Sequence, residues 1–312
     1  MDKKIIAIIV AVIAIVAIGG YFLMGGGNNT VTIGYLPSDH DTALFVADAQ
    51  GKYAKNGINT KLVQFNNGGD LMTAMASGDV DVGYVGITPV LSSIEKGVPV
   101  KVISAAQTEG SGIVVAKNSE INSVSDLAGK KIATPGEASI QHMLLSYYLK
   151  QNGMSINDLK VSAMKVPSMN DAIKTNNIDG MITFEPYVSI AEQNGARVLV
   201  DSADILPNHP CCVVVASNKF IKDHPNETST IVEIHKNATD FINNNTDEAA
   251  SLLPTDIVSD VDVEKKAIAG FPFISGLNES FKDDVMDFMN LEVDLGVIKK
   301  PISEDKIFWE GS

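Results

Sequence analysis

Cysteine is almost absent from this chain, and its placement excludes two common kinds of scaffold. The 312 residues contain 2 cysteines, and these are neighbours, Cys211 and Cys212. Adjacent cysteines supply neither a disulfide framework nor a Cys-x-x-Cys zinc pair. In a regular strand they point to opposite faces, so we expect one to be buried and the other to be able to face a cleft. Plain core packing and a redox or metal role are the alternatives.

Positive charge is also in short supply. The sequence has 24 lysines and arginines against 38 aspartates and glutamates, which gives a formal charge of -14 and a pI near 4.7. A chain this acidic is not expected to bind nucleic acid. Arg197 is the only arginine, so we do not expect a two-pronged guanidinium contact to hold a carboxylate or sulfonate in a cleft. Neutral donors and helix N-termini would have to bind an anion instead.

Short repeats and low-complexity stretches are missing from residues 31–312, which excludes a repeat array. Hydrophobic residues make up 45% of the chain and charged residues 20%, which is typical of a folded globular protein. A chain of 312 residues is expected to form about two domains.

A long apolar run is present at the N-terminus. Residues 5–24 are twenty residues without a charge, preceded by Lys3 and Lys4 and followed by a short glycine and asparagine stretch. That length spans a bilayer as a helix, and the lysines favour a cytoplasmic N-terminus. We therefore expect residues 1–29 to be a membrane anchor and linker, with the remainder outside the cytoplasm at the cell membrane. A cleavable signal peptide is the alternative, but the bulky exit at 21–24 favours an uncleaved segment.

From residue 30 onward, β-type runs alternate with helical stretches. The segments 31–35 and 59–65 read as strands, each followed by a helical pattern, and the alternation continues well beyond them. This pattern predicts an α/β protein with mainly parallel sheets and helices on both faces. We expect two lobes, one of residues 30–115 plus 213–312 and the other of residues 116–212. Two crossings imply a two-strand hinge and a cleft that can enclose a small molecule.

Polar residues follow several predicted strands, at the edge where ligand sites form in such sheets. The turn at Gly136 and the hydroxyl of Ser139 open a long helix, whose first N–H groups are the best candidate cradle for an anion. For Ser38, Thr88 and Ser139 the alternative is an ordinary helix start. The residues predicted to line the ligand site are Ser38, Asp39, His40, Thr88, Gln107, Thr108, Thr134, Gly136, Ser139, Glu185 and Cys212.

Metal binding is a second hypothesis for part of this set. His40, His209, Cys211 and Cys212 lie on segments predicted to converge, and imidazole and thiolate are ligands for soft and borderline metals. Together they are candidates to hold a metal or a metal-bearing solute, which the sequence does not decide. No resident cofactor is expected.

Several segments, taken in order, resemble one known family. They are residues 33–37, 45–58, 75–83 and 126–133, and the Glu185-Pro186-Tyr187 step after a predicted strand. Over about residues 31–225 they are similar to substrate-binding proteins of nitrate, taurine and aliphatic-sulfonate ABC transporters. The resemblance implies a monomer with a two-lobed, type II periplasmic-binding-protein fold and no enzymatic activity, in which the loop after the first strand lines the cleft. It also implies a small-molecule solute, an ABC permease and its ATPase as partners.

Thiamine-pyrimidine synthases resemble the same fold and offer an enzymatic alternative. That family carries a cleft histidine and a cysteine-rich, iron-associated motif, so His40 keeps this interpretation open. The pair Cys211-Cys212 lacks the longer cysteine run, however, and the membrane signal places the domain away from cytoplasmic cofactors. A solute receptor, which closes around its ligand, is therefore our main prediction.

Overall fold

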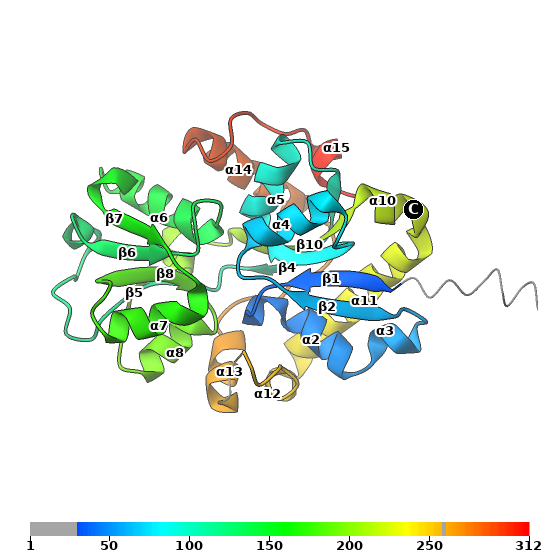
Figure 1. Cartoon of the computed structure of the whole chain (residues 1–312), viewed down its shortest axis with the longest axis horizontal. Coiled ribbons are helices and arrows are strands. Elements are labelled where there is room, and N and C mark those ends of the chain that lie inside the picture. Colours follow the sequence, from blue (N-terminus) through cyan, green and yellow to red (C-terminus); the bar gives the residue numbers. More distant parts are fainter. Residues whose placement is uncertain (1–29, 258–259, 312) are drawn as a thin grey trace, which may run out of the picture.

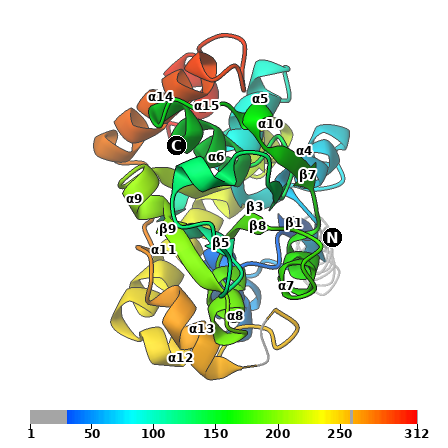
Figure 2. The same cartoon turned by 90° about the vertical axis from the view of Figure 1, so that its left-hand side faces the viewer.

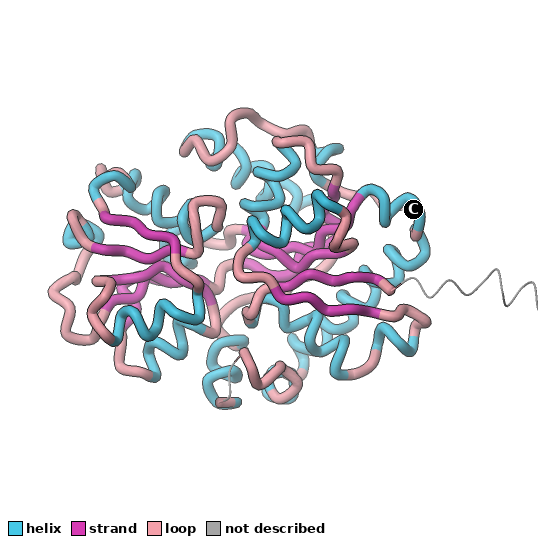
Figure 3. Tube along the Cα trace, in the orientation of Figure 1, coloured by secondary structure: helices cyan, strands magenta, loops and turns pink. Residues whose placement is uncertain are grey.

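Strands and helices alternate up to β10, and the chain beyond it is helical, as the sequence pattern predicts. The computed structural model describes residues 30–257 and 260–311. They form two α/β lobes side by side, each built on its own sheet (Figures 1 and 3). The predicted membrane anchor at residues 1–29 lies outside the described residues. Among the helices of the described part, none combines the length and apolar character needed to cross a bilayer.

Lobe 1 is built on a five-stranded sheet in the order β2-β1-β3-β10-β4. Its strands are β1 (Val31–Tyr35), β2 (Thr60–Gln64), β3 (Val82–Gly86), β4 (Val100–Thr108) and β10 (Pro210–Ser217). Strand β1 is parallel to β2 and β3, whereas β10 is antiparallel to β3 and β4. Helices cover both faces of the sheet, so β3 and nearly all of β10 are buried (Figure 1).

Lobe 2 has a second five-stranded sheet, in the order β7-β6-β8-β5-β9. Its strands are β5 (Ser111–Val115), β6 (Lys131–Thr134), β7 (Lys160–Ala163), β8 (Gly180–Phe184) and β9 (Arg197–Asp201). Strand β6 is parallel to β7 and β8, whereas β5 is antiparallel to β8 and β9. Both sheets are therefore mixed. Strand β5 enters lobe 2 directly from lobe 1, and strand β10 enters lobe 1 directly from lobe 2. Each begins at the edge where the parallel strands of its sheet end, so it runs antiparallel to them.

The crossings between the lobes lie earlier in the chain than the sequence predicts. Residues 111–115 are expected in lobe 1, but β5 pairs within the sheet of lobe 2. Residues 210–212 are expected in lobe 2, but they begin β10 of lobe 1. The two crossing segments contact each other, since the Glu109 N–H donates to the His209 carbonyl over 3.2 Å. A strand buried on both faces has the same apolar composition in either sheet, so composition could not locate the crossing.

Helices of lobe 1 come from both ends of its sequence. They are α2 (Thr42–Ala49), α3 (Lys52–Lys55), α4 (Gly68–Ser77), α5 (Ile87–Glu95), α10 (Asn218–Asp223), α11 (Pro225–Asn244), α12 (Thr246–Ala250), α13 (Val261–Ile268), α14 (Glu279–Asp294), α15 (Glu304–Ile307) and the 3-10 turn η1 (Asp39–Asp41). Helix α11 packs against α2 below the sheet in Figure 1, and α14 packs against α5 above it.

Lobe 2 carries fewer helices. They are α6 (Ile140–Gln151), α7 (Val166–Lys174), α8 (Tyr187–Gln193), α9 (Ser202–Ile205) and the 3-10 turns η2 (Val124–Leu127) and η3 (Ile156–Asp158). Helix α13, from the C-terminal part of lobe 1, contacts α8 of lobe 2 (Figure 2). The lobes therefore meet through side chains near α8 as well as through the crossing segments.

Candidate functional site

The facing edges of the two sheets enclose a cavity of about 300 Å³. Residues 66–69, which follow β2, and residues 135–141, which follow β6, line it as continuous stretches. The segment after β1, the ends of β3, β7 and β8, and the start of β10 complete the lining. Ligands of α/β sheets bind at this strand edge, so the cavity is the first candidate for a solute site.

Three helices begin at the cavity. Asn67 caps α4 by accepting the Asp70 N–H over 2.9 Å, and Ser139 caps α6 by accepting the His142 N–H over 3.1 Å. Helix α5 begins directly after Gly86, which also lines the cavity. Helix N-termini favour negative charge, and no lysine or arginine is found among the described residues of the lining. The cleft is therefore suited to an anion held by neutral donors.

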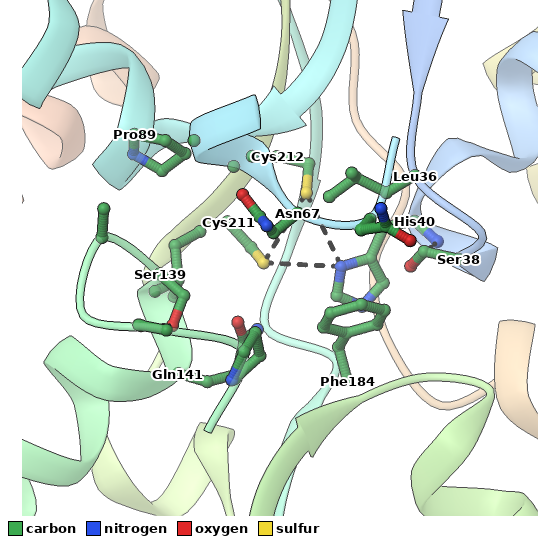
Figure 4. Close-up of a pocket in the computed structure, with 18 of the residues that line it drawn as sticks. Leu36, Ser38, His40, Asn67, Pro89, Ser139, Gln141, Phe184, Cys211 and Cys212 are labelled. Atoms are coloured by element: carbon green, nitrogen blue, oxygen red, sulfur yellow. Dashed lines mark hydrogen bonds between the residues drawn. The ribbon is translucent and has the colours of Figure 1, made fainter. Parts of the chain in front are cut away.

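Two cysteines and a histidine meet at the floor of the cavity (Figure 4). The His40 Nδ1 atom lies 3.6 Å from Cys211 Sγ and 3.6 Å from Cys212 Sγ, and the two sulfurs are 4.0 Å apart. All three side chains are buried. We call His40, Cys211 and Cys212 the His-Cys-Cys cluster.

A β-bulge places both cysteines on the same side, against the prediction that only one can face the cleft. Pro210 pairs with Thr108 of β4 and Cys212 pairs with Gln107, so Cys211 is an extra residue on β10. Such an irregularity redirects side chains away from strict alternation. The Gln107 side chain supports the bulge by accepting the Cys212 N–H over 3.3 Å.

The ring of His40 is held by its surroundings. Its Nε2 atom lies 3.0 Å from the Gly110 carbonyl oxygen, which can only accept, so this nitrogen carries a proton. The ring also packs against Phe184 and Phe271, with centroids 5.6 and 5.0 Å away. Gly110 has φ +79°, and a Cβ at this position would lie 2.5 Å from Nε2. Glycine therefore lets the crossing segment approach the histidine and fix the ring with Nδ1 toward the sulfurs.

Proton positions in the cluster follow from burial and from its close contacts. Burial raises the pKa of Cys211, but hydrogen bonding by Cys212 and the charge and hydrogen bond of His40 outweigh it, so the pKa lies well below its usual value. Burial lowers the pKa of His40, but the charge and hydrogen bond of Cys211 and the Gly110 carbonyl raise it overall. The hydrogen bond to Cys211, together with burial, raises the pKa of Cys212. The arrangement favours a thiolate on Cys211 beside a protonated His40.

The buried carboxyl groups near the cleft are less charged than their number suggests, whereas Glu137, which also lines the cavity, is exposed. Burial raises the pKa of Asp41 to about 8, although its carboxylate accepts the Leu36 N–H over 2.9 Å. Burial also raises the pKa of Asp39 and brings that of Glu264 to about 7. The pKa of Glu185 is raised by burial as well, against two hydrogen bonds from Ser189. Near neutral pH these groups repel an anion weakly.

Some of the residues predicted from the sequence line the cavity. These are Ser38, His40, Gly136, Ser139 and Cys212, together with the metal candidate Cys211. Ser38 has both of the roles considered for it, because it caps η1 by accepting the His40 N–H and donates across the lobes to the Glu185 carbonyl over 3.0 Å. Their contact with a ligand stays a prediction.

The other predicted residues lie outside the lining. They are Asp39, Thr88, Gln107, Thr108, Thr134, Glu185 and His209. The hydroxyl of Thr134 accepts the Gly136 N–H over 3.3 Å, and Glu185 accepts the N–H and hydroxyl of Ser189 inside its own helix turn. His209 contacts the Leu206 carbonyl through Nδ1 over 2.7 Å and is not part of the cluster.

Sequence reasoning missed several lining residues. They are Leu36, Asn66, Asn67, Gly68, Gly69, Gln141 and Phe184. Residues 66–69 follow a predicted strand, so the same strand-end rule could have found them. Phe184 could not be recognised as a lining residue, because an apolar residue at the end of a strand is usually part of the core.

Comparison with known proteins identifies the family. A family model described as NMT1-like family matches residues 25–254. The chain belongs to the NMT1-like family. A putative aliphatic sulfonates-binding protein of Bacillus subtilis is 28% identical over 252 residues, which are 78% of this chain and 74% of the relative. The crystal structure of the periplasmic aliphatic sulphonate binding protein SsuA from Escherichia coli has a TM-score of 0.77 at 20% identity, covering 91% of this chain and 92% of that chain.

An enzyme is also similar to this member of the NMT1-like family. The 4-amino-5-hydroxymethyl-2-methylpyrimidine phosphate synthase of Uromyces fabae is 27% identical over 228 residues, 68% of this chain and 65% of the enzyme. The resemblance to sulfonate-type binding proteins, and its relation in fold to pyrimidine synthases, are therefore confirmed. So is the two-lobed periplasmic-binding-protein fold.

Proposed function

We propose that this protein is the solute-binding component of an ABC importer, and that it captures a small anionic solute between its lobes. The observation that carries the proposal is the cavity where the N-termini of α4, α5 and α6 converge without a basic side chain among the described lining residues. Capture by a binding protein agrees with the relative from Bacillus subtilis, whose name refers to aliphatic sulfonates. Sulfonate, sulfate and nitrate groups each offer several oxygens to backbone N–H donors.

Closure of the lobes is the proposed mechanism. Lobe 1 supplies the starts of α4 and α5, and lobe 2 supplies the start of α6, so an anion in the cavity contacts both. A ligand that contacts both lobes binds the closed form more tightly and shifts the population toward it. In this proposal, a permease and its ATPase then accept the solute from the closed form. Residues 1–29 would tether the monomeric receptor to the outer side of the cell membrane, close to that permease.

A charge placed at the start of α6 tests the site. Aspartate caps a helix as well as serine does, so Ser139→Asp should keep α6, although it loses the bond that the Ser139 hydroxyl donates to the Gly136 carbonyl over 2.6 Å, and it adds a negative charge to the cavity. The full-length protein is melted with nitrate, taurine or ethanesulfonate at about a hundredfold excess over Kd. Such an excess stabilises the folded state by about 2.7 kcal/mol, which raises the melting temperature by several degrees.

We expect Ser139→Asp to weaken binding of the active anion at least tenfold. The matched control is Ser217→Asp, since Ser217 caps α10 in the same way, by accepting the Phe220 N–H over 3.1 Å, and does not line the cavity. Equal loss of affinity in both variants, or none in either, would contradict the proposed site. A wild-type protein that none of the three anions stabilises would contradict the proposed solute class.

A further inference from the structure

The three ligand atoms of the His-Cys-Cys cluster are spaced as a tetrahedral metal site requires. A zinc ion bound at the usual ~2.3 Å to sulfur and ~2.0 Å to nitrogen, with tetrahedral angles, separates two sulfurs by about 3.8 Å and a sulfur from a nitrogen by about 3.5 Å. The observed separations are 4.0 Å between the sulfurs and 3.6 Å from each sulfur to His40 Nδ1. A single ion can therefore reach all three atoms without rearrangement.

The surroundings of the cluster favour this geometry. The Gly110 carbonyl accepts the Nε2 proton of His40, and a ligating histidine is commonly held in this way, with the other ring nitrogen free for the metal. The bulge brings both sulfurs to the side of His40, whereas a regular strand would turn one of them away. A disulfide does not account for the pair, since the sulfurs are 4.0 Å apart, against about 2.05 Å for a bond.

The cluster also lies where a solute in the cavity can reach it. It lies on the floor of the cavity, and the described lining contains no lysine or arginine. A site of two cysteines and one histidine leaves the fourth position of a zinc-type ion for an outside donor. All three residues line the cavity, so a solute bound there is within reach of that fourth position.

We propose that His40, Cys211 and Cys212 bind a soft divalent cation of the zinc type, and that its fourth coordination position takes a donor atom of the solute. Binding of the ion stands on the geometry of the cluster alone. The role of the solute rests on the proposed function. With two thiolates and a neutral imidazole the site balances the charge of the ion, so the ion would hold a solute by coordinating one of its donor atoms and not by net positive charge.

A titration of the full-length, reduced protein with Zn²⁺ against a competing chelator tests the site. We expect one ion per chain, and an affinity at least ~100-fold weaker for Cys211→Ser and for Cys212→Ser. The control is His209→Gln, because this histidine lies two residues from Cys211 but outside the cluster, and it should bind Zn²⁺ as the wild type does. Folded cysteine variants that bind Zn²⁺ as tightly as the wild type would overturn the proposal.

The wild type alone provides a second readout, in case a variant fails to fold. Co²⁺ bound by two thiolates should give a thiolate-to-metal charge-transfer absorption, and Zn²⁺ should remove it. Absence of that absorption, or of any Zn²⁺ binding, would overturn the site.

The open position is tested on the Co²⁺ form with azide, and then with taurine. Azide should change the ligand-field absorption of the ion, and an unchanged spectrum with both anions would overturn the open position. Melting the protein with taurine, ethanesulfonate or nitrate in a chelator separates the two proposals. Unweakened stabilisation by an anion without metal would overturn the solute contact and leave the proposed function standing. Metal binding without stabilisation by any anion would overturn the proposed solute class together with the solute contact, and would leave the metal site standing.

Discussion

At the residue scale, burial decides which groups in this protein carry charge. Asp41 and Glu264 lie near the cleft, and burial raises their pKa values to about 8 and about 7, so neither is fully ionised at neutral pH. Cys211 and His40 favour their charged forms instead: the protonated imidazole lowers the pKa of Cys211, and the thiolate raises the pKa of His40. An anion in the cavity therefore meets a less negative environment than a formal charge of -14 suggests.

His235 gives the most direct test of such a shift away from the cleft. Its Nε2 donates to the Ala105 carbonyl over 2.8 Å, its Nδ1 lies 3.2 Å from the Tyr84 hydroxyl, and burial lowers its pKa from 6.5 to about 4. Between these pH values the unfolded chain binds a proton that the folded chain does not. The contribution of His235 to the free energy of unfolding is therefore complete above pH 6.5, and about 3 kcal/mol of it is lost as the pH drops to 4.

The measurement is urea unfolding at several pH values for the wild type and for His235→Gln. The variant loses a buried hydrogen bond and should be less stable at pH 7, yet its stability should fall less steeply on acidification. Identical slopes in the two proteins would show that His235 titrates normally in the folded state.

Part of the site could be predicted at this scale. His40, Gly136 and Ser139 were accessible to sequence reasoning, because each follows a predicted strand and such residues gather at one sheet edge. The placement of both cysteines on one side was not, although Cys211 is among the predicted metal candidates, since the expected alternation puts it opposite Cys212. A bulge depends on the register between β10 and β4, and register is a property of two segments far apart in the chain.

At the scale of the elements, the crossing segment at Gly110 links the hinge to the cluster. Its carbonyl holds His40, and a side chain at this position would meet His40 Nε2 and the Phe271 ring. The sequence predicted the alternation of strands and helices and the presence of two crossings. It misplaced the crossings because β5 and the start of β10 are buried, and a buried strand has the same apolar composition in either sheet.

Gly110→Ala should therefore destabilise the protein more than a glycine substitution elsewhere. The matched control is Gly153→Ala, because Gly153 has φ +72°, close to the +79° of Gly110, but a Cβ added to it would have no atom of the described residues within 4 Å. Backbone strain of roughly 1–2 kcal/mol is common to both variants. The free energy of unfolding should fall further in Gly110→Ala, and equal losses would show that the contact with His40 is unimportant.

At the scale of the whole molecule, α13 and α8 join the lobes through exposed polar contacts, in addition to the part-buried bond of Ser38 to the Glu185 carbonyl beside the cleft. Lys266 of α13 pairs with Glu192 of α8 over 2.6 Å, and Gln193 donates to Asp260 over 2.8 Å. Exposed pairs of this kind contribute little to stability. Weak contacts outside the cleft suit a receptor whose lobes must separate, because they do not hold the closed form without a ligand.

A double-mutant cycle with Glu192→Gln and Lys266→Met should give a coupling energy below about 1 kcal/mol in the free energy of unfolding. The pair Lys219 and Asp223, which lies within α10 at 3.0 Å, serves as a reference inside one lobe. A coupling of several kcal/mol across the lobes would contradict the view that they separate easily.

Amide hydrogen exchange of the full-length protein tests the enclosure of a solute between the lobes most directly. The probe is whichever of nitrate, taurine and ethanesulfonate raises the melting temperature most. Because both lobes contribute helix starts to the cavity, we expect slower exchange at residues 66–69 of lobe 1 and at residues 136–141 of lobe 2, and no such protection in Ser139→Asp. Protection confined to one lobe, or protection that survives in Ser139→Asp, would contradict the proposed enclosure.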